Sequence, residues 1–228
     1  MFDRWFSWFR SGRVAPRVVR RHASPDGPRL VLVVEGRHDI EFLKRIAALL
    51  HADDPTLPDL AGLERARILL FVPAGGGDFR PWSTRLAPLG LAEFHLYDRE
   101  ISPETERRRV WAALVNERPR CRAFVTARRS LENYLHPAAI HEARGVSLGD
   151  SPDDDVAELA ARALFVLSPT AAVWEELSRR ARRRLRDRAK SWLNTTAVER
   201  MTVARLREQD PDGEVVDWLR AIGELLTT

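Results

Sequence analysis

Hydrophobic positions along the chain follow two different periods. Largely apolar runs without alternation lie at 30–34, 67–72, 92–97 and 122–126, and such runs predict strands that are buried on both faces. Between the strands, apolar residues recur at helical spacing, as they do at 38–50. Strands that alternate with helices predict βαβ units. We therefore expect an α/β fold with a doubly wound, mainly parallel sheet that has helices on both faces.

The same pattern predicts which side of each later helix is buried. The helix that begins near Ser102-Pro103-Glu104 is expected to bury four residues, namely Val110, Trp111, Leu114 and Val115. Beyond about residue 148 the sequence predicts only helices, at about 155–167, at about 171–193 and from Asp212 onwards. The last of these helices is expected to bury Val215, Trp218, Leu219 and Ile222.

Residues 1–29 combine aromatic residues with arginines and precede the first predicted strand. The arginines interrupt every apolar stretch, so the segment is not a secretory signal. It suits a short helix docked on the domain or on a partner, a helix at a membrane surface, or a nucleic-acid-binding arm. A poorly ordered leader is the alternative. The rest of the chain divides into an α/β domain at 30–145 and a helical C-terminal region at 146–228.

Composition limits the class of protein. Of the 228 residues, 44% are hydrophobic and 31% are charged, which is typical of a soluble globular protein. No apolar run approaches the roughly 18 residues that a membrane span requires. Cys121 is the only cysteine, which excludes an internal disulfide and a cysteine-built zinc site and suits a reducing cytoplasm. We therefore expect a cytoplasmic protein without a transmembrane segment.

Carboxylates follow two of the predicted strands. Glu35 comes directly after the first strand, Asp98 and Glu100 come after the third, and Asp39 lies one helical turn beyond Glu35. If the two strands are neighbours, these acids meet at one edge of the sheet, where they repel one another unless a cation is present. Oxygen ligands suit Mg²⁺ or Mn²⁺, and a pair of such ions can promote phosphodiester hydrolysis. Helix-capping and turn roles are the alternative for each acid taken singly.

These motifs resemble a known family. The segment Val33-Val34-Glu35-Gly36-Arg37-His38-Asp39-Ile40-Glu41-Phe42-Leu43 resembles the signature of TOPRIM domains. Tyr97-Asp98-Arg99-Glu100 resembles their Asp-x-Asp motif, although Glu100 stands in place of the second Asp. Ser130-Leu131-Glu132 is similar to the Ser-x-Glu of the OLD-type (overcoming lysogenization defect) branch. The resemblance covers about residues 30–140.

The resemblance implies roles for several residues. Glu35 would be a metal ligand or a general acid/base, and the expected catalytic domain is that at 30–145. Arg128 or Arg129 would steady the scissile phosphate. The other residues that the resemblance places at the divalent ions are Asp39, Asp98, Glu100, Ser130 and Glu132.

The helix at about 171–193 has a narrow apolar stripe and many arginines on its other sides. These arginines are either a solvated face that reflects genome composition or a surface that contacts nucleic-acid phosphates. We favour the second interpretation because the expected active site handles nucleic acid. The candidate phosphate-binding residues are Arg179, Arg180, Arg182, Arg183, Arg184 and Arg186.

The expected function is that of an OLD-like, divalent-metal-dependent nuclease that hydrolyses DNA. OLD-type nucleases usually carry an ATPase domain, whereas this sequence has no Walker motif and hence no ATP site. We therefore expect a module that acts alone, with a possible homodimer, or one that works with a separately encoded ATPase. The alternatives are a non-catalytic TOPRIM-fold protein that binds nucleic acid or assembles recombination complexes, and an RNA-processing nuclease.

Overall fold

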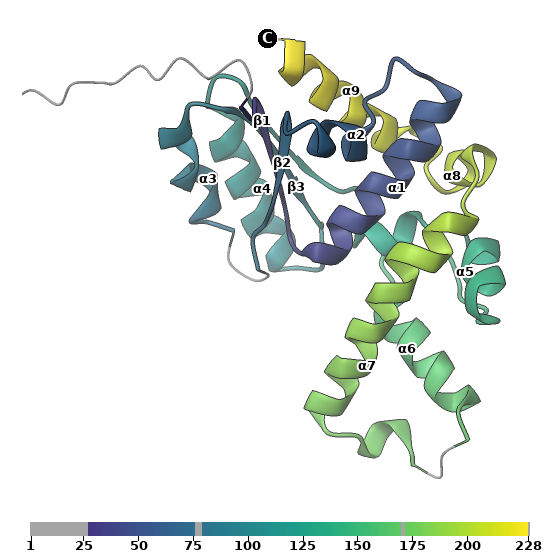
Figure 1. Ribbon diagram of the computed structural model, residues 1–228. Coiled ribbons are helices and arrows are strands. Elements are labelled where there is room, and N and C mark those ends of the chain that lie inside the picture. The colour runs from purple at the N-terminus through teal and green to yellow at the C-terminus, as the bar shows by residue number, and fades with distance from the viewer. Residues whose placement is uncertain (1–26, 76–78, 170–171, 228) are drawn as a thin grey trace, which may run out of the picture.

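The structure is a computed structural model that describes residues 27–75, 79–169 and 172–227. Within these ranges, four strands form one parallel sheet in the order β2-β1-β3-β4 (Figure 1). The strands are β1 (Leu30–Val34), β2 (Leu69–Pro73), β3 (Ala92–Tyr97) and β4 (Cys121–Val125). The predicted parallel α/β sheet is therefore confirmed, whereas the predictions for residues 1–26 lie outside the described residues.

The position of each strand explains its sequence. All five residues of β1 are buried, because β2 and β3 flank this strand and helices cover both of its faces. β2 lies at the edge of the sheet, and one of its residues, Leu70, is 46% exposed. The unbroken apolar run at 30–34 is thus the signature of the central strand.

The connections between strands place a crevice beside β1. Three crossovers contain α1 (Arg37–Asp53) with α2 (Leu60–Arg65), α3 (Trp82–Arg85) and α4 (Glu104–Asn116). β2 lies on one side of β1 and β3 lies on the other, so the strand order reverses between β1 and β3. In open α/β sheets, the carboxyl ends of the strands at such a reversal form the ligand-binding crevice.

Two apolar clusters fill the two sides of the sheet. On one side, Trp111 and Val115 of α4 lie in a cluster with Phe79 and Tyr97. On the other side, residues of β1, β2 and β3 share a larger cluster with α1 and with the helices that follow β4. Helices therefore cover both faces of the sheet, as predicted.

The buried side of α4 differs from the prediction. Trp111 and Val115 are buried, but Val110 and Leu114 are 59% and 41% exposed. The helix instead turns Arg108 inward, at helical spacing with Trp111 and Val115. The sequence pattern misled because a buried arginine is read as a surface residue.

The chain after β4 is helical, as predicted, with more helices than the sequence indicated. Two helices lie where they were predicted, namely α6 (Val156–Leu167) and α9 (Glu214–Thr227). Two further helices were not predicted, namely α5 (Pro137–Arg144) and α8 (Val203–Gln209). A 3₁₀ turn at Leu131–Tyr134 precedes them, and a π-helical turn at Leu193–Ala197 follows α7 (Arg179–Trp192). α9 buries the four residues expected of it.

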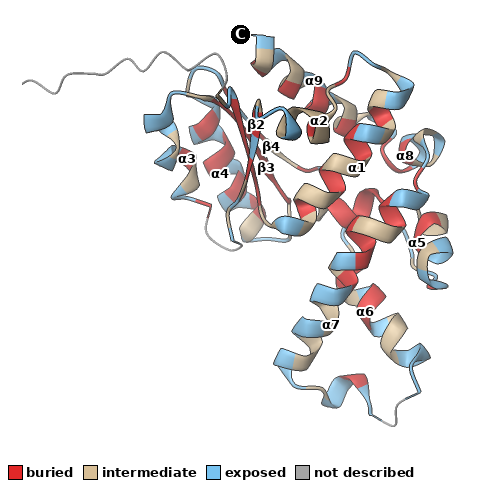
Figure 2. Cartoon of the chain, viewed as in Figure 1, coloured by how far each residue is buried: buried red, intermediate tan, exposed pale blue. Residues whose placement is uncertain are grey.

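α6 and α7 form a hairpin that projects from the body of the molecule, and its outer end is largely exposed (Figures 1 and 2). The helix predicted at about 171–193 was too long, because α7 begins at Arg179. The Ser178 side chain accepts a hydrogen bond from the backbone N–H of Ala181 and thereby caps the helix. Across the described ranges, no helix combines the length and the apolar character that crossing a bilayer requires.

Candidate metal centre

Three carboxylates meet at the carboxyl ends of β1 and β3. Glu35 directly follows β1, and Asp98 and Glu100 follow β3. One carboxylate oxygen from each of the three lies within 4.8 Å of the other two. They therefore lie in the crevice that the reversal of strand order creates.

Asp39 and Glu132 complete the acidic group from two further elements. Asp39 lies in the first turn of α1, and its Oδ2 accepts a hydrogen bond of 2.8 Å from the backbone N–H of Gly36. Asp98 Oδ1 accepts one of 3.2 Å from the backbone N–H of Leu131, the neighbour of Glu132. Asp39, Asp98 and Glu132 are each at most 4% exposed. This hydrogen bond from Leu131 thus ties the segment that carries Glu132 to the end of β3.

Two basic residues that the sequence analysis did not assign to the site, the buried Arg108 and the half-buried Lys190, balance part of this charge. Arg108 of α4 forms an ion pair with Glu35 and donates a hydrogen bond to the backbone carbonyl of Asp98. Lys190 of α7 lies 3.7 Å from Glu132 Oε1, measured from Nζ. Asn194 donates a hydrogen bond of 2.8 Å to the same oxygen. The centre therefore joins α4 and α7 to the two strand ends.

Burial dominates the ionisation of three of the acids. It raises the pKa of Glu35, although Arg108 opposes the shift. Burial, assisted by the charge of Glu35, raises the pKa of Asp39 to about 7. Burial, again assisted by Glu35, raises the pKa of Asp98 well above its ordinary value. A divalent cation would favour the ionised form of all three.

Glu132 behaves differently from its neighbours. Burial opposes its ionisation, but Lys190 and the hydrogen bond from Asn194 outweigh that effect, so its pKa lies below the ordinary value. In return, Glu132 raises the pKa of Lys190. Lys190 is therefore a permanent cation at the edge of the centre.

The donor set fits a hard divalent ion. Asp98 Oδ2 and Glu132 Oε2 are buried and have no hydrogen-bond partner among the residues that the structure describes. A buried charged oxygen without a partner is costly, and metal coordination removes that cost. Carboxylate oxygens from several elements are the ligands that Mg²⁺ and Mn²⁺ prefer.

The remaining predicted site residues have varied surroundings. The Ser130 hydroxyl donates a hydrogen bond of 2.9 Å to Asn133 Oδ1. Arg129 lies 3.4 Å from a Glu100 carboxylate oxygen and 3.3 Å from one of Asp155. The Arg128 guanidinium lies 5.8 Å from the centre of the Tyr134 ring. The structure thus brings Arg129 to the edge of the acidic group, whereas Arg128 contacts the aromatic ring.

The six arginines of α7 that the sequence analysis selected fall into two sets. Arg186 forms an ion pair of 2.9 Å with Asp155, the residue that caps α6, and is therefore engaged within the protein. The others are exposed or half-buried, and the structure shows no ion pair for them within the described ranges. This second set comprises Arg179, Arg180, Arg182, Arg183 and Arg184.

One feature of the sequence pointed to Lys190. The chain has 37 basic residues other than histidine, and only Lys44 and Lys190 are lysines. A rare lysine among so many arginines suits a position where a compact charge is needed, since an ammonium is smaller than a guanidinium, but Lys44 shares this feature and pairs with Glu64 near the surface, so the feature alone did not identify Lys190. No comparable signal distinguished Arg108.

The chain is similar to solved structures of the C-terminal regions of OLD proteins. Two structures of the C-terminal region of the OLD protein of Xanthomonas campestris pv. campestris, phased with iodine and with mercury, match it at 15% identity. Their TM-scores are 0.51 and 0.50, and the matches cover 88% of this chain and 96% and 97% of theirs. No family model and no curated protein matches the sequence. The chain has the fold of the C-terminal region of the Xanthomonas OLD protein.

Proposed function

We propose that this protein is a divalent-metal-dependent nuclease that hydrolyses phosphodiester bonds of DNA. The observation that carries the proposal is the convergence of Glu35, Asp98 and Glu100, whose carboxylate oxygens lie within 4.8 Å of one another. These residues come from two strand ends in the crevice of the sheet. The partnerless oxygens of Asp98 and Glu132 support the proposal independently.

Glu35, Asp98 and Glu100 would hold one Mg²⁺ or Mn²⁺ ion, and Asp39 and Glu132 would contribute to a second. Such ions supply a nucleophilic hydroxide at neutral pH and neutralise charge on the phosphate. The role of the surrounding protein is to fix the acids before the substrate arrives. Arg108 does so for Glu35, and the Gly36 N–H does so for Asp39.

Lys190, Arg129 and Arg128 are the basic residues that would contact the scissile phosphate. Because its pKa is raised, Lys190 stays protonated and acts as a positive charge rather than as a base. It would stabilise the additional negative charge that develops on the phosphate during hydrolysis. Arg129 would reach the phosphate by exchanging its contact with Asp155 for one with the substrate. Arg128 would do the same by leaving Tyr134.

The test is cleavage by the purified protein. It should cut plasmid or linear DNA when Mg²⁺ or Mn²⁺ is added and should stop in EDTA. Glu35→Gln and Asp98→Asn should each lower the rate at least about 100-fold, because each removes a charged metal ligand. Glu106→Gln is the matched control, since Glu106 is an exposed acid of α4. Cleavage that survives both site variants would reject the proposal.

A specific observation favours one alternative. Arg108 and Lys190 already neutralise two of the buried acids, which reduces the charge left for metal ions. A non-catalytic protein that binds nucleic acid would retain such ion pairs for structure alone. Salt-sensitive DNA binding without cleavage under either metal would select this alternative. Cleavage of RNA in preference to DNA in the same assay would select the RNA-processing nuclease.

Assembly belongs to the same proposal. A separately encoded ATPase and a homodimer are the partners expected of a module without a Walker motif. Light scattering of the purified protein determines whether it forms a dimer. Stimulation of cleavage by ATP together with a co-expressed ATPase tests whether an ATPase is a partner.

A further inference from the structure

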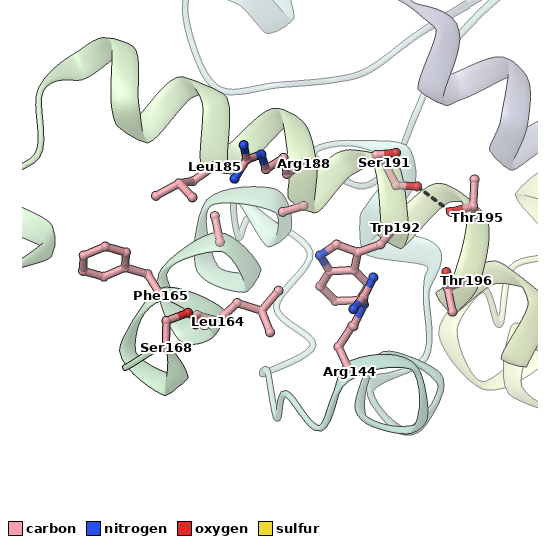
Figure 3. Close-up of a pocket in the computed structure, with 12 residues that line it drawn as sticks. Arg144, Leu164, Phe165, Ser168, Leu185, Arg188, Ser191, Trp192, Thr195 and Thr196 are labelled. Atoms are coloured by element: carbon pink, nitrogen blue, oxygen red, sulfur yellow. Dashed lines mark hydrogen bonds between the residues drawn. The ribbon is translucent and has the colours of Figure 1, made fainter. Parts of the chain in front are cut away.

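A pocket of about 500 Å³ lies between α6 and α7. Figure 3 shows that Leu164 of α6 points toward Trp192 of α7, whereas the Phe165 ring points away from Trp192, on the side of Leu185. Trp192 is two residues from Lys190, and two residues turn an α-helix by about 200°. The pocket and the candidate metal centre therefore lie on opposite sides of α7.

Two arginines stand at the rim of this pocket. Arg144 reaches it from the end of α5, and Arg188 reaches it from α7 (Figure 3). Both are exposed, and neither has an ion-pair partner among the described residues. Arg188 also continues the line of Arg180 and Arg184, which lie eight and four residues earlier on the same side of the helix. An occupant of the pocket must therefore carry negative charge where it meets the solvent.

The interior of the pocket indicates the rest of the occupant. Aromatic and aliphatic side chains form its floor, and the hydroxyl-bearing residues Ser168, Ser191 and Thr196 lie along its wall. Trp192 is only 6% exposed, and its Nε1 has no hydrogen-bond partner within the described ranges. Figure 3 shows this nitrogen on the edge of the ring that faces Leu164. This nitrogen is buried beneath the lining and is closed to an occupant, so recognition rests on the apolar lining and on the two arginines at the rim, which together match a flat ring joined to phosphates.

We propose that this pocket holds one nucleotide of single-stranded DNA. The base lies against Leu164 and the edge of Trp192 that borders the pocket, and the adjoining phosphates contact Arg144 and Arg188. The volume falls within the range of about 300–1,000 Å³ that is typical of ligand sites. The inference takes DNA as the ligand from the proposed function. Because the pocket lies on the far side of α7 from the acids, the bound nucleotide anchors the strand and is not the one that is cleaved.

The experiment measures binding of labelled oligo-dT and of a labelled duplex by fluorescence anisotropy in EDTA, so that no cleavage occurs. Leu164→Trp fills the pocket from a half-buried position and should weaken oligo-dT binding about tenfold or more, because the base is excluded from the pocket. Its affinity for the duplex should not change. Val110→Trp, which adds the same ring to an exposed position of α4, is the matched control.

A second variant keeps the test valid if the filled pocket disturbs folding. Arg144→Ala with Arg188→Ala alters only exposed residues and should weaken oligo-dT binding more than duplex binding, whereas Arg109→Ala on α4 should alter neither. The inference is overturned if both pocket variants bind oligo-dT as the unmodified chain does, or if they lose oligo-dT and duplex equally. Binding in EDTA is independent of cleavage, so failure of the nuclease proposal would be seen separately.

Discussion

Asp39 links the candidate centre to the stability of the fold. In the absence of metal its pKa is raised to about 7, mainly by burial, whereas in the unfolded chain it has its ordinary value of 3.8. Between about pH 4 and pH 7 the folded protein therefore binds more protons than the unfolded chain. The contribution of Asp39 to the free energy of unfolding falls as the pH rises through this window. Asp39→Asn should flatten this decline, as measured by urea unfolding in EDTA at several pH values.

Metal should reverse the sign of that dependence, because the ion favours the ionised carboxylates. Adding Mn²⁺ should raise the unfolding midpoint more at pH 8 than at pH 5, where protons compete for Asp39. If Mn²⁺ raises the unfolding midpoint of Asp39→Asn as much as that of the unmodified chain at both pH values, Asp39 does not contribute to the ion site.

Loss of Lys190 should strongly destabilise the fold. Lys190→Met leaves Glu132, which is only 1% exposed, without its cation, and removal of one partner of a buried pair costs about 3–5 kcal/mol. Lys44→Met is a matched control, because its partner Glu64 is 39% exposed and the loss should be about 0–1 kcal/mol. Urea unfolding of both variants gives the comparison. Equal stabilities of the two lysine variants would contradict the assignment of Lys190 to the centre.

At the residue scale, the sequence predicted the acids better than the bases. Glu35, Asp98 and Glu100 follow strand ends, and parallel strands bring their carboxyl ends to one edge. Arg108 and Lys190 reach the same place from the middle of α4 and the end of α7. Their position depends on how those helices pack, which the local sequence does not encode. Because arginine and lysine are mostly exposed in folded proteins, the sequence pattern predicts an exposed position for such a residue within a helix.

At the element scale, α7 combines three surfaces. Lys190 faces the acids, Leu185 and Trp192 line the pocket, and Arg183 and Arg184 are exposed. Arg183→Ala with Arg184→Ala should weaken binding to all DNA sequences alike. The slope of log affinity against log salt concentration should decrease by the amount expected for the loss of about two phosphate contacts. Anisotropy titrations at several salt concentrations give the slope.

A control on another helix makes this prediction specific. Arg107→Ala with Arg109→Ala removes two exposed arginines from α4, on the other side of the sheet, and should leave the slope unchanged. If the two double variants lower affinity equally, net charge alone explains binding and α7 is not a dedicated surface.

The helices and strands were predictable where their packing imposes a regular pattern of apolar residues on the sequence. β1 coincides with its prediction because this strand is buried on both faces and is apolar throughout. β3 also coincides with its prediction, although it buries Glu93 and His95, which bond to each other. α5 and α8 were missed since each is at most eight residues long, too short for a helical period to stand out. The start of α7 was misplaced because Val173, which matched the apolar stripe, is 47% exposed and lies before the helix.

At the scale of the whole molecule, the helices after β4 share one core with the sheet. α9 packs against β3 and β4, and its Trp218 is 1% exposed and lies 5.3 Å from Tyr134, centroid to centroid. The main apolar cluster runs without interruption from β1 through α1 to α9. The ranges 30–145 and 146–228 that the sequence suggested as separate regions are therefore expected to unfold together.

Trp218→Ala tests this cooperativity. The substitution should destabilise the entire chain by about 3–5 kcal/mol, because a large buried side chain leaves a cavity. Circular dichroism and tryptophan fluorescence should report one coincident transition, at a lower urea concentration than in the unmodified chain. Val166→Ala, at a position that is 72% exposed near the end of the α6–α7 hairpin, should change stability by less than about 0.5 kcal/mol. Two separated transitions in Trp218→Ala would instead mean that the sheet folds without the C-terminal helices. Lys190 would then reach Glu132 only when the two units dock.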